Sequence, residues 1–193
     1  MSDRDRRETL LKLHYPTAII DFPCEIGDDT AIWRNAHISR DAVIGSNCMI
    51  GEGVHVGPGV KIGDGCRIQN GAQLFEGVTL EENVFVGPHV VFTNVLTPRA
   101  FSKRADAFAQ TLVKRGASIG ANATILCGIE IGEFALIGAG SVVTKSVPHH
   151  ALAFGTPTKV AGWVCDCGEN LFHLQCTKCH AKYHFDENGP TRA

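Results

Sequence analysis

The chain has 193 residues, of which 44% are hydrophobic, a formal net charge of -2 and a sequence pI of about 6.5. This composition allows a packed core and argues against disorder. The basic residues form no long run, which argues against a nucleic-acid partner, and no stretch has the roughly 20 apolar residues that would indicate a membrane partner. Residues 1–13 are charged and lack the apolar region of a signal peptide, so we expect a cytoplasmic protein.

We assign residues 1–19 to an N-terminal segment, after which large apolar residues recur at every sixth position. A small or β-branched residue stands two positions before them, and glycine often follows, as at Gly27 and Gly45. This period predicts short strands with two inward positions each, joined by tight corners. The large positions are Ile20, Ile26, Ile32, Ile38, Ile44, Ile50, Val56, Ile62, Ile68, Leu74, Leu80, Val86 and Phe92.

These repeats resemble those of the hexapeptide-repeat family. The resemblance implies an all-β fold, a left-handed parallel β-helix over residues 20–162, in which three hexapeptides make one triangular coil. Residue n then lies beside residue n + 18 of the next coil, so outward residues can be assigned to columns.

The repeat breaks after Phe92 and resumes at Val113, which predicts a projecting loop over about residues 93–112. If Val113 takes the place expected for position 98, the insertion is 113 − 98 = 15 residues long. Long loops that project from compact domains are usually functional.

Glu76 and Asn94 are 18 positions apart, so we expect them to be neighbours at the corner where the loop leaves the helix. A carboxylate and a carboxamide both offer acceptor oxygens that could orient an amine nucleophile. From their spacing alone, both residues could equally be solvated corner residues.

The segment Phe92-Thr93-Asn94-Val95, followed by Pro98-Arg99-Ala100 and by residues 112–117, resembles the sugar 3-N-acetyltransferases of O-antigen pathways. In those enzymes the asparagine contacts the sugar amino group, which implies this role for Asn94. The resemblance also implies transfer of acetyl from acetyl-CoA to the 3-amino group of a UDP- or dTDP-linked sugar, in a homotrimer with active sites between subunits. It is closest to enzymes acting on UDP-2-acetamido-3-amino-2,3-dideoxyglucuronate, whose carboxylate Arg99 could bind bidentately.

Two alternatives stay open. The acceptor could be a dTDP-3-amino-3,6-dideoxyhexose or another small molecule, and activity on a sugar without a nucleotide would favour the second of these. The chain could also be a non-catalytic β-helix scaffold or a metal-binding protein, and failure to bind CoA would support that interpretation.

His89 is the alternative catalytic residue, because many hexapeptide acetyltransferases use a histidine as general base. Its column differs from that of Asn94, and a histidine at a repeat corner is commonly a surface residue. An amine that is already neutral needs no strong base, so positioning and oxyanion stabilisation could supply most of the rate.

The run from Ile137 to Lys145 resembles the stretch whose backbone lines the pantetheine arm of CoA in this family. Ala121 lies 18 positions before Ala139, and this column of small residues would let the arm lie along the coils, although small residues also suit tight corners. Lys145 and Lys159 are candidates for binding CoA phosphates, or are solvated lysines.

His37 and His55 are also 18 positions apart and point outward. Carbonic anhydrases of the family hold zinc with three histidines across a subunit interface, but here the next rung is Gln73. We therefore favour a surface or trimer-contact role for this pair.

The cysteines fall into two groups. In a cytoplasmic chain they should be reduced, and those at inward small positions (Cys24, Cys48 and Cys66) are expected to be core thiols. Residues 163–193 contain two closely spaced pairs, which predict a structural zinc site of four thiolates in a zinc-ribbon-like segment: Cys165, Cys167, Cys176 and Cys179. Three histidines of this segment could replace one of them: His173, His180 and His184.

Overall fold

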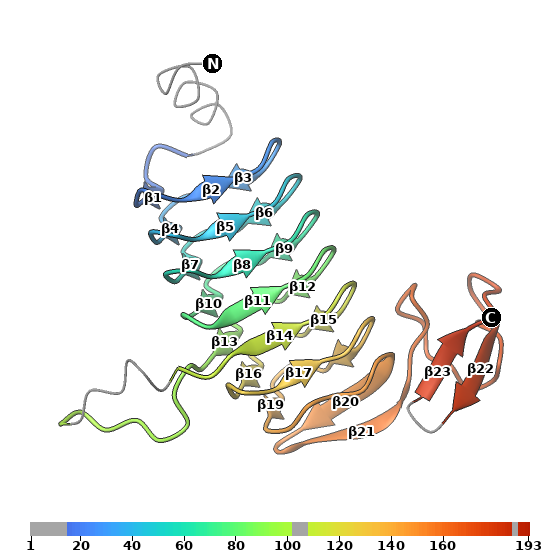
Figure 1. Ribbon diagram of the computed structural model, residues 1–193. Coiled ribbons are helices and arrows are strands. Elements are labelled where there is room, and N and C mark those ends of the chain that lie inside the picture. Colours follow the sequence, from blue (N-terminus) through green and yellow to red (C-terminus); the bar gives the residue numbers. More distant parts are fainter. Residues whose placement is uncertain (1–14, 102–107, 187–188) are drawn as a thin grey trace.

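The computed structural model describes residues 15–101, 108–186 and 189–193. Within these ranges the protein is all-β, as the repeat predicts. Figure 1 shows short strands stacked coil upon coil along one axis, with a hairpin at the far end and a separate two-stranded sheet at the C-terminus. The arrangement is consistent with the predicted left-handed β-helix.

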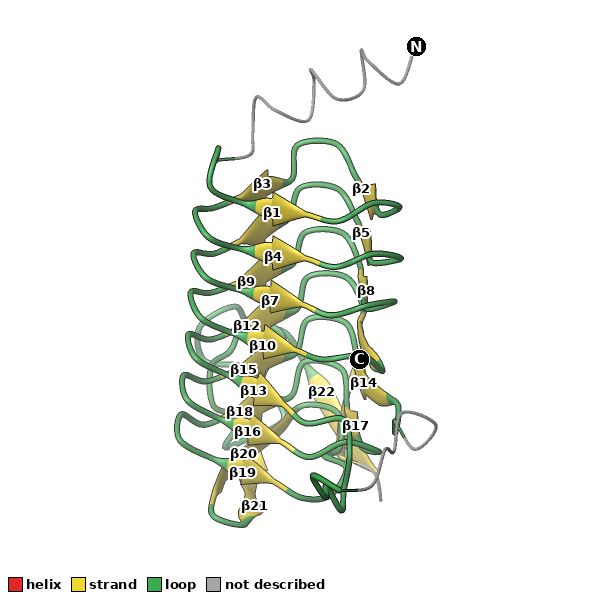
Figure 2. Ribbon diagram, turned by 90° about the vertical axis from the view of Figure 1, so that its left-hand side faces the viewer, coloured by secondary structure: helices red, strands yellow, loops and turns green. Residues whose placement is uncertain are grey.

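The strands of the coils lie in three sheets, one along each side, and we name each sheet after its first strand (Figures 1 and 2). The β1 face consists of β1 (Ile19–Ile20), β4 (His37–Ile38), β7 (His55–Val56), β10 (Gln73–Leu74), β13 (Val91–Phe92), β16 (Thr124–Ile125) and β19 (Val142–Val143). The β2 face consists of β2 (Glu25–Ile26), β5 (Val43–Ile44), β8 (Lys61–Ile62), β11 (Val78–Leu80), β14 (Thr111–Val113) and β17 (Glu130–Ile131). The β3 face consists of β3 (Ala31–Ile32), β6 (Met49–Ile50), β9 (Arg67–Ile68), β12 (Phe85–Val86), β15 (Ser118–Ile119) and β18 (Leu136–Ile137), and continues into the terminal hairpin.

The pairing register confirms that three hexapeptides make one coil. Ile20 pairs with Ile38 on the β1 face, and every coil before the loop repeats this step. Leu80 pairs with Val113, which takes the place expected for position 98, so the coils on both sides of the loop stack in register. Strand β14 already begins at Thr111, because this residue pairs with Val78, and the projecting segment therefore ends earlier than predicted.

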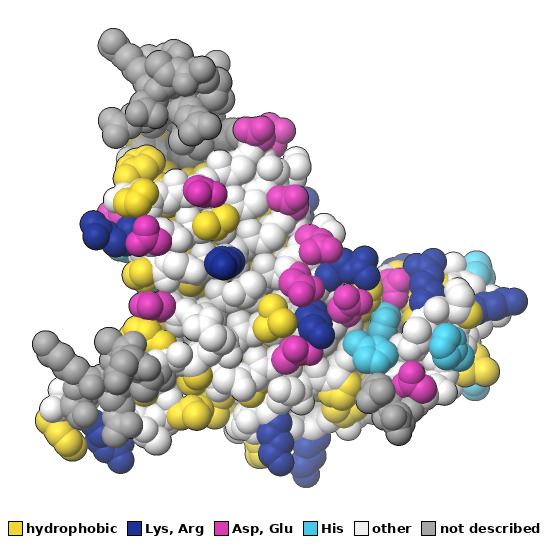
Figure 3. Space-filling model, in the orientation of Figure 1, with side chains coloured by type: hydrophobic (Ala, Val, Ile, Leu, Met, Phe, Trp, Pro, Cys, Tyr) yellow, Lys and Arg dark blue, Asp and Glu magenta, His cyan; other side chains and the backbone are white. Residues whose placement is uncertain are grey.

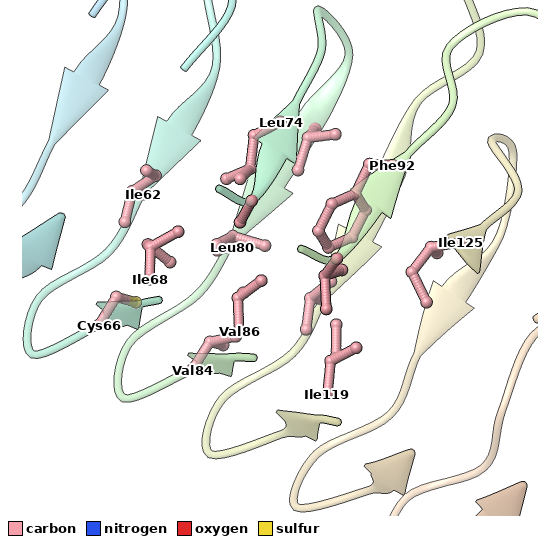
Figure 4. Packing of buried hydrophobic residues seen from close by; sticks show 14 of the residues in the cluster. Ile62, Cys66, Ile68, Leu74, Leu80, Val84, Val86, Phe92, Ile119 and Ile125 are labelled. Atoms are coloured by element: carbon pink, nitrogen blue, oxygen red, sulfur yellow. The ribbon is translucent and has the colours of Figure 1, made fainter. Parts of the chain in front are cut away.

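The core fills the inside of the coils with one large and one small residue per hexapeptide. Leu74, Leu80 and Phe92 stack with their counterparts in neighbouring coils, and each is at most 1% exposed (Figure 4). Burying such a side chain contributes about 1.5–3 kcal/mol, so the repeat itself supplies the stability of the coils. Cys48 and Cys66 lie in this core, which confirms that they are core thiols.

The corners use residues that tolerate a left-handed backbone. Gly65 and Asn83 occupy equivalent places in successive coils, with φ angles of 68° and 58°. Glycine lacks the Cβ that disfavours this conformation, and asparagine tolerates it better than most residues. His89 has the same conformation, with φ 57°, and its side chain is exposed.

The last coil is closed by an antiparallel hairpin of β20 (Ala151–Gly155) and β21 (Thr158–Trp163). Strand β20 pairs in parallel with β18, so the hairpin extends the β3 face. Beyond it, β22 (Tyr183–Asp186) and β23 (Gly189–Arg192) form the separate sheet of the cysteine-rich segment. Within the described ranges, no helix is long and apolar enough to cross a membrane.

Candidate functional site

The first candidate site is the corner between the β1 and β2 faces, which we call the Asn94 corner. Leu74, Phe92, Ile125 and Val143 pair in register along the β1 face. The residues two positions after them form one column, which consists of Glu76, Asn94, Cys127 and Lys145. The structure thus brings Glu76 and Asn94 into adjacent rungs and adds two residues that sequence reasoning had not placed there.

The base of the projecting loop is fixed at this corner by hydrogen bonds that backbone N–H groups donate. The Ala109 N–H donates to the Asn94 carbonyl at 3.1 Å, and the Cys127 N–H donates to Thr93 Oγ1 at 3.0 Å. The Asn94 side chain is half-buried and that of Glu76 is exposed, so both can be reached from outside the coil. Arg99 is exposed further along the loop, where its guanidinium donates to the carbonyl of Pro98 at 2.9 Å.

The second candidate site is the corner between the β3 and β1 faces, which we call the Ala139 corner. Val86, Ile119 and Ile137 pair in register, so Ala121 and Ala139 stand in one column directly beside the rung that carries His89. The His89 N–H donates to the Asn70 carbonyl at 2.9 Å, and a Cβ at Gly71 would collide with the His89 ring. Sequence reasoning missed this proximity, although the longer step from Val86 to Ile119 across the loop was available to find it.

The two candidate CoA lysines lie on different corners. Ala153 of the hairpin pairs with Ile137, so Gly155 takes the next place in the Ala139 column. Lys159 pairs with Phe154, the residue before Gly155. Lys159 therefore lies at the Ala139 corner. Lys145 is at the Asn94 corner, on the other side of the β1 face.

The His37 and His55 rings lie on successive rungs of the β1 face, with centroids 5.4 Å apart. His37 Nε2 lies 2.9 Å from a carboxylate oxygen of Asp21, and the His55 ring contacts Phe75. Burial, and then the neighbouring His37, lower the pKa of His55. The pair therefore has one carboxylate and one aromatic ring at its ends, and no third histidine completes it in the described structure.

Two adjoining hollows on the β2 face were not predicted from the sequence. Their volumes are about 340 and 590 Å³, and Glu130 and Ser146 line both of them. Lys114 and Glu130 form an ion pair of 2.8 Å there, and this contact raises the pKa of Lys114. The Oγ1 atom of Thr111, which lines the smaller hollow, is buried without a hydrogen-bond partner.

The four cysteines of the C-terminal segment converge on one point. The Sγ atoms of Cys165, Cys167, Cys176 and Cys179 all lie within 4.8 Å of one another. The Cys165 and Cys179 sulfurs are 3.3 Å apart, and those of Cys167 and Cys176 are 3.7 Å apart. Four thiolates around zinc at about 2.3 Å stand roughly 3.8 Å apart, so this donor set fits the ion.

Local groups already favour one of these thiolates. The Cys179 N–H lowers the pKa of Cys176 to about 6, whereas burial raises that of Cys165 to about 12. The histidines visible in Figure 3 gather around this segment and its junction with the β-helix, but the described ligand cluster contains cysteines alone.

The repeats are those of the bacterial transferase hexapeptide (six repeats) family, whose model matches residues 23–58, 41–76, 59–94 and 111–145. The chain belongs to this family. The stretch between the third and fourth matches corresponds to the projecting loop.

Among individual proteins, the chain is similar to dTDP-3-amino-3,6-dideoxy-alpha-D-galactopyranose 3-N-acetyltransferase of Aneurinibacillus thermoaerophilus. The two are 53% identical over 66 residues, which is 34% of this chain and 34% of the relative. The match thus spans about a third of that relative's length.

Two solved structures share the fold. The product of the BC4754 gene of Bacillus cereus has a TM-score of 0.55 and 27% identity, with 79% of this chain and 77% of that chain covered. A mutant of GDP-perosamine N-acetyl transferase from Caulobacter crescentus, in complex with CoA and GDP-perosamine, has a TM-score of 0.50 and 20% identity, with 83% and 65% covered.

Proposed function

We propose that the protein transfers an acetyl group from acetyl-CoA to the 3-amino group of a UDP- or dTDP-linked sugar. The observation that carries this proposal is the Asn94 corner, where a half-buried carboxamide stands over a carboxylate at the base of a projecting loop. Family membership and the 53% identity to a dTDP-3-amino-sugar acetyltransferase support it. Our preferred acceptor is UDP-2-acetamido-3-amino-2,3-dideoxyglucuronate, because the exposed Arg99 could pair with its carboxylate.

The separation of the two corners supports a homotrimer with active sites between copies. Neighbouring corners are one hexapeptide apart, roughly 15–20 Å along an extended chain, whereas reacting atoms must approach to about 3 Å. Between them, the β1 face presents the half-buried side chains of Val91, Thr124 and Val142, which suit contact with another copy. In our proposal, the Asn94 corner of one copy faces the Ala139 corner of the next.

In this arrangement the acceptor amine lies at the Asn94 corner and the thioester at the Ala139 corner. The carboxamide oxygen of Asn94 accepts a hydrogen bond from the amine and directs its lone pair to the thioester carbon. The C–N bond forms, and collapse of the tetrahedral intermediate breaks the C–S bond and releases CoA as the leaving group. The amine proton passes to the leaving thiolate, either directly or through His89, which lies on the thioester side.

The first test is turnover of acetyl-CoA with a panel of UDP- and dTDP-linked 3-amino sugars, both with and without a carboxylate. We expect activity to require the nucleotide and the 3-amino group, and to be highest on the uronate. Absence of CoA binding by calorimetry would contradict the whole proposal.

Subunit complementation tests whether the site is shared. Asn94→Ala damages one corner, and Ala139→Trp blocks the other. On limiting acceptor, Ala139→Trp alone should be nearly inactive and Asn94→Ala should lose about 5- to 150-fold. Equimolar co-refolded mixtures should exceed the average of the two parents by up to about a quarter of wild-type activity, because a quarter of random subunit boundaries pair two intact corners. A mixture no more active than its parents would place the site within one chain.

We also propose that Cys165, Cys167, Cys176 and Cys179 hold a structural zinc ion. The fit of their four sulfur atoms supports this site, and the ion would stabilise the C-terminal segment by cross-linking its two cysteine pairs.

A further inference from the structure

Tyr183 links the cysteine cluster to the body of the protein. Its hydroxyl lies 3.1 Å from Cys165 Sγ, and its side chain is only 3% exposed. The same hydroxyl donates to Asp166 Oδ1 at 2.8 Å and accepts the Asp166 N–H at 3.1 Å. A tyrosine hydroxyl ordinarily has a pKa of about 10, so it keeps its proton at neutral pH.

Once a metal is bound, the single hydroxyl proton of Tyr183 has two possible acceptors, the Asp166 carboxylate and the Cys165 thiolate. A cysteine thiol can donate to the tyrosine oxygen, but a metal-bound thiolate can only accept. The Tyr183 hydroxyl can turn its proton from Asp166 to the thiolate, because Arg192 still donates to the other carboxylate oxygen of Asp166 at 2.8 Å. Tyr183 is therefore placed to donate to the Cys165 thiolate.

The ring of Tyr183 also packs against the last coil of the β-helix. It meets His150 edge-on, with ring centroids 5.5 Å apart, and His150 in turn stacks on Phe134 at 5.2 Å. His150 Nδ1 lies 3.0 Å from the carbonyl oxygen of Val164, next to the first cysteine. The residue that touches the sulfur is thus also the residue that contacts the coil.

We propose that Tyr183 supports the four-cysteine metal site and couples metal binding to docking of the C-terminal segment on the β-helix. Its hydroxyl donates to the Cys165 thiolate, and its ring, which this hydrogen bond holds in place, packs against His150. This inference rests on the proposed zinc site, but is independent of the acetyl-transfer proposal.

The test is metal affinity in Tyr183→Phe, which keeps the ring and all four ligands. Zinc affinity is measured by competition with a chromogenic chelator, and cobalt spectra report four-thiolate coordination. We expect one metal per chain, with a dissociation constant raised about 10- to 100-fold over wild type. Tyr15→Phe, at the opposite end of the helix, is the matched control and should bind as wild type does.

An unchanged affinity in Tyr183→Phe would overturn the role of the hydroxyl. A wild-type protein that binds neither zinc nor cobalt would overturn the metal site itself, and these two failures are distinguishable.

Docking is measured without altering the segment. Trp163 contacts Phe185 and lies against Gly189, so in a Trp33→Phe background its fluorescence reports the position of the C-terminal sheet. Removal of zinc by a chelator should shift its emission to longer wavelength, and added zinc should reverse the shift. Unchanged emission after complete metal removal would overturn the coupling.

Discussion

Replacing Asn94 by alanine removes the carboxamide from the base of the projecting loop and leaves the backbone that holds the loop. The Asn94 carbonyl still accepts the Ala109 N–H, and Phe92 still fills the core beneath it. The loss is therefore confined to the polar partner of the acceptor amine, a contact worth about 1–3 kcal/mol. We expect kcat/KM for the amino sugar to fall about 5- to 150-fold.

Steady-state kinetics with the sugar varied at saturating acetyl-CoA measures this change, and calorimetry measures CoA affinity. Asn94→Asp is the matched control, because it keeps the acceptor oxygens and should recover most of the activity. CoA affinity should be unchanged, since in the proposed arrangement the Asn94 carboxamide contacts the acceptor amine and not the CoA held at the Ala139 corner of the next copy. Normal turnover by Asn94→Ala, or a loss of CoA binding as large as the loss of turnover, would refute this placement of the acceptor.

Three further predictions concern other parts of the chain. His89→Ala should lose less than about tenfold in activity if orientation by Asn94 dominates, and a loss above about a hundredfold would identify His89 as the general base. Purified protein should contain about one zinc per chain, and metal-free wild type would contradict this. The double variant Cys176→Ser with Cys179→Ser should lose the zinc while keeping the circular dichroism of the β-helix. Burial lowers the pKa of His55 in the folded state, so the unfolded chain binds more protons as the pH falls below about 6.5, and the stability of the protein decreases there. His55→Gln should flatten this decrease in urea titrations between pH 7 and 5. An unchanged dependence of stability on pH in this variant would contradict the prediction.

The repeat predicted the fold because each hexapeptide carries its own inward pair. Leu74 and Phe92 need no knowledge of distant residues to be recognised as core, and a constant step from coil to coil then places Glu76 beside Asn94. The same step of 18 residues does not hold across the loop, where the insertion lengthens it. Cys127 and Lys145 join the Asn94 column only after the register across the loop is known.

The C-terminal segment shows the other limit. Cysteine spacing predicted which four cysteines converge, since closely spaced pairs are a local signal. The contacts of Tyr183 with His150 and Asp166 could not be predicted, because these side chains come from elements without a repeat. The larger hollow on the β2 face depends likewise on how Pro148 and Trp163 approach the last coils.

The loop enters and leaves the helix at a single corner, and the coils on both sides keep their rungs in register. Its length and sequence are thus uncoupled from the hydrogen bonds and packing that hold the coils together. A segment attached in this way can be exchanged as a unit, so under the proposed function the choice of acceptor can diverge between relatives while the Ala139 corner and the core stay the same. Replacing residues 95–108 of this chain by the corresponding segment of another family member should transfer sugar preference without changes to the coils.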